Sequence, residues 1–143
     1  LVVASHNAVR LGMPERVKFI ESDLLGRFLD ADFLGTFDFA VSNPPYVGSH
    51  EVNMVQREVR EFEPRVAWGG LECGDEIYRR LFPQALRVLK PGGYAVVEIG
   101  YNMRERVLAL LGEGWTEVEV CSDLRGIPRV VSAKKQESGV RSQ

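Results

Sequence analysis

The chain has 143 residues, of which 45% are hydrophobic and 27% are charged, and its formal net charge is −2. The weak negative charge excludes an overall basic field, so we expect no direct nucleic-acid binding. The sequence holds no apolar run long enough for a membrane span and does not open with a signal peptide, so we expect a cytoplasmic protein without membrane contact.

Candidate metal ligands are sparse and scattered. Cys73 and Cys121 lie far apart, and His6 and His50 stand in polar surroundings without a cysteine nearby. None of these side chains shows the spacing of a metal site. The pattern therefore predicts no metal site, with both thiols reduced.

The first half of the sequence alternates between helical and strand patterns. Residues 3–11 fit the end of an amphipathic helix that Gly12 stops. Residues 16–21 alternate between polar and apolar side chains, which predicts a short strand. An apolar run at 37–42 is typical of a buried parallel strand. The alternating charges of residues 51–66 predict an exposed helix, or a loop with helical pieces.

A long amphipathic helix opens the second half. Asp75 stands where it can cap this helix, and the Lys-Pro-Gly-Gly sequence at 90–93 ends it with a turn. The apolar face of the helix consists of Ile77, Leu81, Phe82, Ala85, Leu86 and Leu89. Residues 94–99 then predict a strand.

The remaining elements are shorter. Asn102 is placed to cap a helix that runs to Leu111. Strands are predicted at 115–122 and 129–133, and the polar residues 134–143 predict a disordered tail. Strands that alternate with helices indicate an α/β domain with a mainly parallel sheet.

The Asn43-Pro44-Pro45-Tyr46 stretch is the clearest chemical motif. A strand delivers Asn43 at its carboxyl end, where open α/β sheets bind their ligands. The two prolines fix the backbone and have no N–H, so they form a stiff corner. The Asn43 side-chain carbonyl and the Pro44 backbone carbonyl remain as acceptors, and the Tyr46 ring can form a flat wall beside them.

This corner is suited to a planar nitrogen. The lone pair of an amide or aromatic amine is delocalised, so the nitrogen is a poor nucleophile. Two acceptors that bind its two hydrogens can orient the lone pair toward a methyl donor and stabilise the positive charge that develops. The motif therefore predicts methylation of such a nitrogen, although a simple turn after a strand has the same residue types.

Further motifs follow in a fixed order along the chain. They are Asp23-Leu24, Val41 to Val47, Phe62-Glu63-Pro64, Gly69-Gly70, Ile77-Tyr78-Arg79, Leu89 to Gly93, Glu98-Ile99-Gly100 and Asp123 to Gly126. This order resembles the release factor glutamine methyltransferase family (HemK/PrmC type), over nearly the whole chain. The resemblance implies a Rossmann-like methyltransferase fold that uses S-adenosylmethionine.

The resemblance also implies a substrate. Family members methylate the side-chain amide nitrogen of the glutamine in the Gly-Gly-Gln motif of peptide chain release factors, which would be the protein partner. Asn43 and Pro44 would hold the glutamine amide, and Pro45 and Tyr46 would complete its slot. Glu63 matches a loop near the substrate.

On the cofactor side, Asp23 and Leu24 match the positions that flank the adenine, and Asn43 also lies near the methyl donor. The family's glycine-rich loop and the acidic residue that grips the ribose have no counterpart in this sequence. We therefore expect residues 1–133 to be the C-terminal portion of the catalytic domain, truncated at the N-terminus. Alone, this portion is expected to be marginally stable and to bind the cofactor weakly. We interpret Glu98, at a strand end, as structural rather than as a base.

Three other functions remain open from the residues. A nucleic-acid adenine or guanine amine methyltransferase would use the same corner on a flipped base. A glutamine methyltransferase that acts on a ribosomal protein would share the whole site. A non-catalytic α/β module that binds a protein would have lost the cofactor loop.

Overall fold

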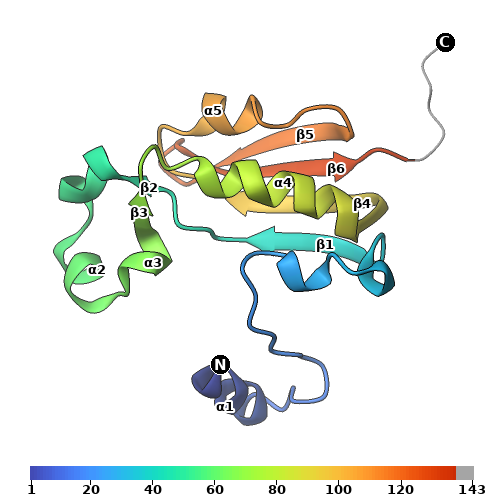
Figure 1. The fold of residues 1–143 in the computed structure, drawn as a ribbon. Coiled ribbons are helices and arrows are strands. Elements are labelled where there is room, and N and C mark those ends of the chain that lie inside the picture. Colours follow the sequence, from blue (N-terminus) through green and yellow to red (C-terminus); the bar gives the residue numbers. More distant parts are fainter. Residues whose placement is uncertain (138–143) are drawn as a thin grey trace.

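The computed structural model of the chain describes residues 1–137, and its centre is a four-stranded sheet in the order β1-β4-β6-β5 (Figure 1). The strands are β1 (Phe37–Ser42), β4 (Leu89–Glu98), β6 (Pro128–Lys135) and β5 (Trp115–Ser122). The α/β class is confirmed. The expected mainly parallel sheet is wrong for the described residues, because β1 and β4 are parallel while both other pairs are antiparallel. A short turn joins β5 to β6, and only an antiparallel hairpin can be closed that way.

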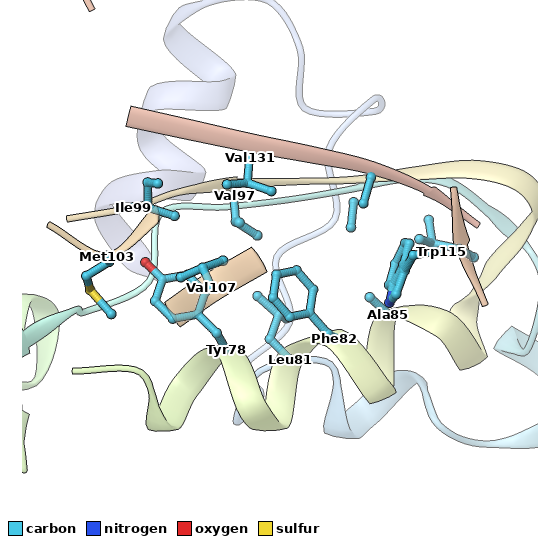
Figure 2. Close-up of a cluster of buried hydrophobic side chains, with 13 residues drawn as sticks. Tyr78, Leu81, Phe82, Ala85, Val97, Ile99, Met103, Val107, Trp115 and Val131 are labelled. Atoms are coloured by element: carbon cyan, nitrogen blue, oxygen red, sulfur yellow. The ribbon is translucent and has the colours of Figure 1, made fainter. Parts of the chain in front are cut away.

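Two helices cover one face of this sheet and form the core with it (Figure 2). They are α4 (Glu76–Val88) and α5 (Arg104–Leu108). The predicted helix face is correct in its centre, where Leu81, Phe82 and Ala85 are buried against the sheet. The fully buried Tyr78 belongs to the same face. Helix α4 contacts β4 directly, and Phe37 and Ala40 of β1 pack against the same core.

The N-terminal part matches the prediction only in its helix. Helix α1 (Val2–Arg10) ends before Gly12, whose φ of +69° suits a glycine. The strand predicted at 16–21 is wrong, since these residues have no strand structure and Ile20 is exposed. A strand needs a partner for its backbone groups, and none of residues 1–137 pairs with this segment. Two 3-10 helices, η1 (Gly26–Phe28) and η2 (Ala31–Phe33), lead from it to β1.

Strand β1 lies at the edge of the sheet rather than in its interior. Its parallel pairing with β4 is confirmed, but Phe39 and Val41 are 62% and 75% exposed, so the predicted burial is wrong. Within residues 1–137 no strand pairs with its second edge. An apolar run of this kind is typical of a strand in the interior of a parallel sheet. Among residues 1–137, however, β1 has a neighbouring strand at one edge only.

A separate arm leaves the sheet after β1 and returns to it before α4 (Figure 1). Its ends are β2 (Val47–Gly48) and β3 (Gly69–Leu71), which pair in parallel. Between them run η3 (Ser49–Met54), α2 (Arg57–Phe62) and α3 (Arg65–Trp68). The prediction of a loop with helical pieces is confirmed. We call residues 47–71 the arm.

Two predicted helix caps differ from the structure. Asp75 is the N-cap residue of α4, but its buried carboxylate makes no cap bond and instead pairs with Arg79 at 2.8 Å and Arg106 at 3.3 Å. Helix α5 begins at Arg104, so the capping role of Asn102 is wrong. The Asn102 side-chain amide instead donates to Glu51 Oε1 at 2.9 Å.

Two predicted boundaries also move. Strand β4 begins at Leu89, and the turn predicted at 90–93 is an irregularity inside it, opposite the step from Phe37 to Phe39. Strand β6 continues through Lys135, so the predicted tail boundary at 134 is wrong. The pairing of Lys134 and Lys135 with β5 accounts for the extension. The rest of the predicted tail from 138 lies outside the described residues. None of the helices in 1–137 is long and apolar enough to span a membrane.

Candidate active site

The candidate site begins where β1 ends. Asn43 follows the last residue of the strand and is exposed, whereas Pro44 is buried. No described side chain or loop backbone group within 1–137 forms a hydrogen bond with the Asn43 amide. The proline after Asn43 disfavours a helical backbone at Asn43, so the chain stays extended where β1 ends. An open polar amide therefore stands at the carboxyl edge of the sheet.

One cleft unites the five residues for which the resemblance implied substrate contact. Asn43, Pro44, Pro45, Tyr46 and Glu63 all line a cleft of about 260 Å³. The arm supplies the rest of the wall, which consists of Val47, Val55, Val59, Ala67 and Trp68. Most of the lining residues have apolar side chains, and the carboxamide of Asn43 and the carboxylate of Glu63 add polar groups. A small planar polar group fits this combination.

The arm is held against the corner at both of its ends. Pairing of β2 with β3 closes its base, and the backbone N–H of Gly48 donates to Glu51 Oε2 at 3.3 Å. The other oxygen of Glu51 accepts from Asn102, in the loop after β4. The indole N–H of Trp68 donates to the Glu63 carbonyl at 3.4 Å, which holds the far side of the arm together. The Glu51–Asn102 hydrogen bond thus ties the arm to the loop after β4.

Tyr46 is held in place by its surroundings. Its hydroxyl donates to Glu98 Oε1 at 3.0 Å. A Cβ on Gly100 would lie 3.1 Å from Cδ2 of the Tyr46 ring, so the glycine permits this close approach. Burial, then the hydrogen bond and charge of Glu98, raise the pKa of the Tyr46 phenol. The phenol is therefore neutral at physiological pH and acts as a donor.

Sequence reasoning missed most of this support. The sequence predicted no contact of Glu98 or Gly100 with Tyr46, and it did not place Trp68 in the site. The available signal was that Glu98 ends, and Gly100 follows, a strand that runs parallel to β1, because parallel strands end at the same edge. The interpretation of Glu98 as structural agrees with its bond to Tyr46.

Asp23 and Leu24 lie outside the Asn43 cleft. Asp23 is exposed, and its carboxylate accepts from Arg80 at 2.5 Å in an open depression of about 670 Å³. Leu24 adopts a left-handed backbone with φ of +52° and lines an apolar pocket of about 190 Å³. Ser42, the neighbour of Asn43, lines the same pocket. Leu24 therefore shares a pocket with the last residue of β1, next to Asn43. Asp23 lines a different depression.

Comparisons with known proteins give a consistent result. No protein-family model matches the chain. It is 46% identical over 138 residues to the release factor glutamine methyltransferase of Koribacter versatilis, and 41% identical over 137 residues to that of Bradyrhizobium diazoefficiens. These matches cover 96% and 94% of this chain but 47% and 44% of the relatives. The chain therefore spans about half the length of the curated relatives that it matches.

One solved structure supports the fold. TrmN from Thermus thermophilus has a TM-score of 0.58 with this chain at 19% sequence identity. The match covers 94% of this chain and 32% of TrmN. At this identity the likeness concerns the fold alone, and it agrees with the predicted Rossmann-like α/β class.

Proposed function

We propose that this chain, whose sequence relatives are the release factor glutamine methyltransferases, carries the substrate-gripping part of a protein-glutamine N5-methyltransferase. The observation that carries the proposal is the cleft in which the Asn43 amide, without a hydrogen-bond partner among residues 1–137, lies beside the buried Pro44. We assign residues 1–135 to this catalytic portion, two residues more than the sequence pattern predicted, because β6 ends there.

The corner would act by holding the glutamine amide. Its two N–H groups would donate to the Asn43 side-chain oxygen and to the Pro44 carbonyl, which turns the nitrogen lone pair toward the methyl donor. A nitrogen–carbon bond forms while the bond from that carbon to the donor sulfur breaks, and the sulfur leaves as a neutral thioether. The methylated nitrogen then loses one proton to water. Both acceptors interact most strongly when the nitrogen is positive, so they favour the transition state.

S-adenosylmethionine would supply the methyl group. Leu24 and the apolar pocket that it shares with Ser42 suit one face of an adenine ring, and the exposed Asp23 carboxylate suits its amino group. Asn43 follows Ser42 directly, so it would lie near the reactive methyl. In this assignment Asp23 exchanges its contact with Arg80 for one with the cofactor.

The substrate would be a glutamine of a release factor in the cytoplasm. The apolar lining of the cleft suits the methylene groups of a glutamine, and Pro45 and Tyr46 would form the sides of its slot. Glu63, across the cleft, would meet the backbone of the substrate loop. The relatives are named for this substrate, which favours it over a nucleic-acid base or a ribosomal protein.

The test is transfer of labelled methyl groups from S-adenosylmethionine by the full-length gene product that contains this sequence. Purified release factor, ribosomal protein and RNA are offered as separate acceptors. We expect label on the release factor, at the glutamine of its Gly-Gly-Gln motif, and none when that glutamine is replaced by alanine. Label on RNA or ribosomal protein alone would overturn the substrate assignment, and no transfer to any acceptor would support a non-catalytic module.

A further inference from the structure

We propose that Glu98 is a positioning residue that sets the orientation of the Tyr46 ring and thereby the shape of the substrate slot. This inference rests on the proposed function, which places Tyr46 beside the glutamine amide. It concerns how the slot is kept in shape, and it gives a role to a carboxylate that does not line the cleft itself.

Glu98 is well fixed in the fold. It is the last residue of β4, and its backbone carbonyl accepts a hydrogen bond of 2.6 Å from the hydroxyl of Tyr78. The next residue, Ile99, donates its N–H to the Arg129 carbonyl at 2.8 Å. Tyr78 and Ile99 are both completely buried. The backbone at Glu98 is therefore bonded to α4 through Tyr78, and the next residue is bonded to the start of β6 through Arg129. These contacts fix the position from which the Glu98 side chain extends.

The Glu98 carboxylate meets the phenol of Tyr46, which stands between it and the cleft. Glu98 Oε1 is the hydrogen-bond partner of that hydroxyl, at 3.0 Å. Close approach of Gly100 to the ring allows this orientation, but a glycine supplies no directional contact. The hydrogen bond is thus the directional contact that selects one ring orientation. A tilted ring would change the width of the slot next to Pro44 and Pro45.

A role as general base does not fit this geometry. The carboxylate already accepts a hydrogen bond from the Tyr46 phenol, and it does not line the cleft that Asn43 lines. Tyr46 and Arg129 share the lining of a second, smaller pocket of about 140 Å³ on the side away from Asn43. Glu98 thus acts through Tyr46, and its removal should alter the rate of transfer rather than a protonation step.

The test compares variants of the full-length gene product in the methyl-transfer assay. Glu98→Ala should lower kcat by about 10-fold to 100-fold, as expected for a small misplacement of a slot wall. Glu98→Gln keeps an acceptor oxygen and should recover most of that loss. Tyr46→Phe removes the same bond from the other side, and the double variant Tyr46→Phe/Glu98→Ala should be no worse than Tyr46→Phe alone. Glu119→Ala, which removes an exposed carboxylate on β5, is the matched control.

Three results would overturn the inference: unchanged kcat in Glu98→Ala, a Glu98→Gln variant as slow as Glu98→Ala, or additive losses in the double variant. If Glu98→Ala does not fold, the Tyr46→Phe and Glu98→Gln variants still decide the question.

A readout without activity separates this inference from the proposed function. Nuclear magnetic resonance of labelled tyrosine should show that Glu98→Ala moves the pKa of Tyr46 down toward its ordinary value, while Glu119→Ala leaves it unchanged. If the unaltered protein transfers no methyl group, the proposed function fails, yet this titration still reports on the Tyr46–Glu98 bond. An unchanged Tyr46 pKa in Glu98→Ala would overturn the inference by itself.

Discussion

Gly74 lies directly against the backbone carbonyl of Tyr46. A Cβ on Gly74 would lie 2.4 Å from that carbonyl oxygen. Gly74 also has a φ of +89°, which side chains disfavour. The turn before α4 and the corner after β1 are therefore packed backbone against backbone. Any side chain at Gly74 must push Tyr46, and with it the wall of the cleft.

We expect Gly74→Ala to damage both stability and catalysis. The clash and the left-handed backbone should together cost about 2–3 kcal/mol of unfolding free energy, and displacement of Tyr46 should reduce methyl transfer about 100-fold. Thermal unfolding and kcat measure the two effects. The matched control is Gly112→Ala, since a Cβ at Gly112 meets nothing within 4 Å. Equal behaviour of the two variants would contradict the packing argument.

Asn43→Ala should leave the fold intact and remove catalysis. Because Asn43 is exposed and its amide has no partner in residues 1–137, the variant should unfold at nearly the wild-type temperature. Loss of one preorganised acceptor should cost about 2–4 kcal/mol of transition-state stabilisation, which is seen in kcat. The exposed Asn53 of η3 supplies the control variant Asn53→Ala. Near wild-type turnover of Asn43→Ala would show that the amide grip is wrong.

Asp75 should make the fold sensitive to acid. Burial alone would raise the pKa of its carboxyl, but the Arg79 hydrogen bond and the charges of Arg106 and Arg79 hold the pKa below the usual 3.8. A carboxyl whose pKa is lower in the folded state contributes stability above its unfolded pKa. This stability is lost as the pH falls below about 3.8 toward the folded value.

The matching measurement is the unfolding free energy of Asp75→Asn as a function of pH. At pH 7 the variant should be less stable by about 2 kcal/mol, because α4 and α5 lose their ionic tie. The difference from wild type should shrink as the pH falls below about 3.8, because the unfolded wild-type chain takes up a proton there that the folded carboxylate binds only at lower pH. A difference that stays constant down to pH 2 would show that the charge of Asp75 is irrelevant to stability.

The 143-residue chain by itself should bind S-adenosylmethionine only weakly. In the proposed function Asp23 and Leu24 would flank the adenine, but the sequence contains no glycine-rich loop that could hold the rest of the cofactor. Titration calorimetry should give a dissociation constant well above micromolar, and thermal unfolding should show marginal stability, since one edge of β1 is open among the described strands. Micromolar binding by this chain would contradict the expectation.

The chemical corner was predictable from sequence because its geometry is local. Two prolines after a strand leave few backbone conformations, so the open position of Asn43 follows from a few adjacent residues. The bounds of β1 and β5 were also predicted correctly, since both follow periodic patterns closed by turn residues. Such signals do not depend on the rest of the fold.

The errors concern contacts between distant segments. The strand predicted at 16–21 has a suitable pattern, but a strand forms only where another strand offers hydrogen bonds. Asn102 has the residue type of a helix cap, yet the Glu51 carboxylate offers its amide a charged partner. The missing partner strand of residues 16–21 and the Glu51 carboxylate both concern segments far away in the sequence, so the local pattern does not reveal them. For the same reason the support of Tyr46 by Glu98 was missed.

The ladder between β2 and β3 brings the two ends of the arm together, so the arm both leaves and re-enters the sheet at one place. The segment between these anchors supplies Val55, Val59, Glu63, Ala67 and Trp68 to the cleft wall, whereas Asn43 and Pro44 precede the arm. In the proposed function, the amide grip and the outer contacts to the partner would then lie on different segments of the chain. If the proposed function holds, exchange of residues 49–68 is the change that would test whether the arm selects the acceptor.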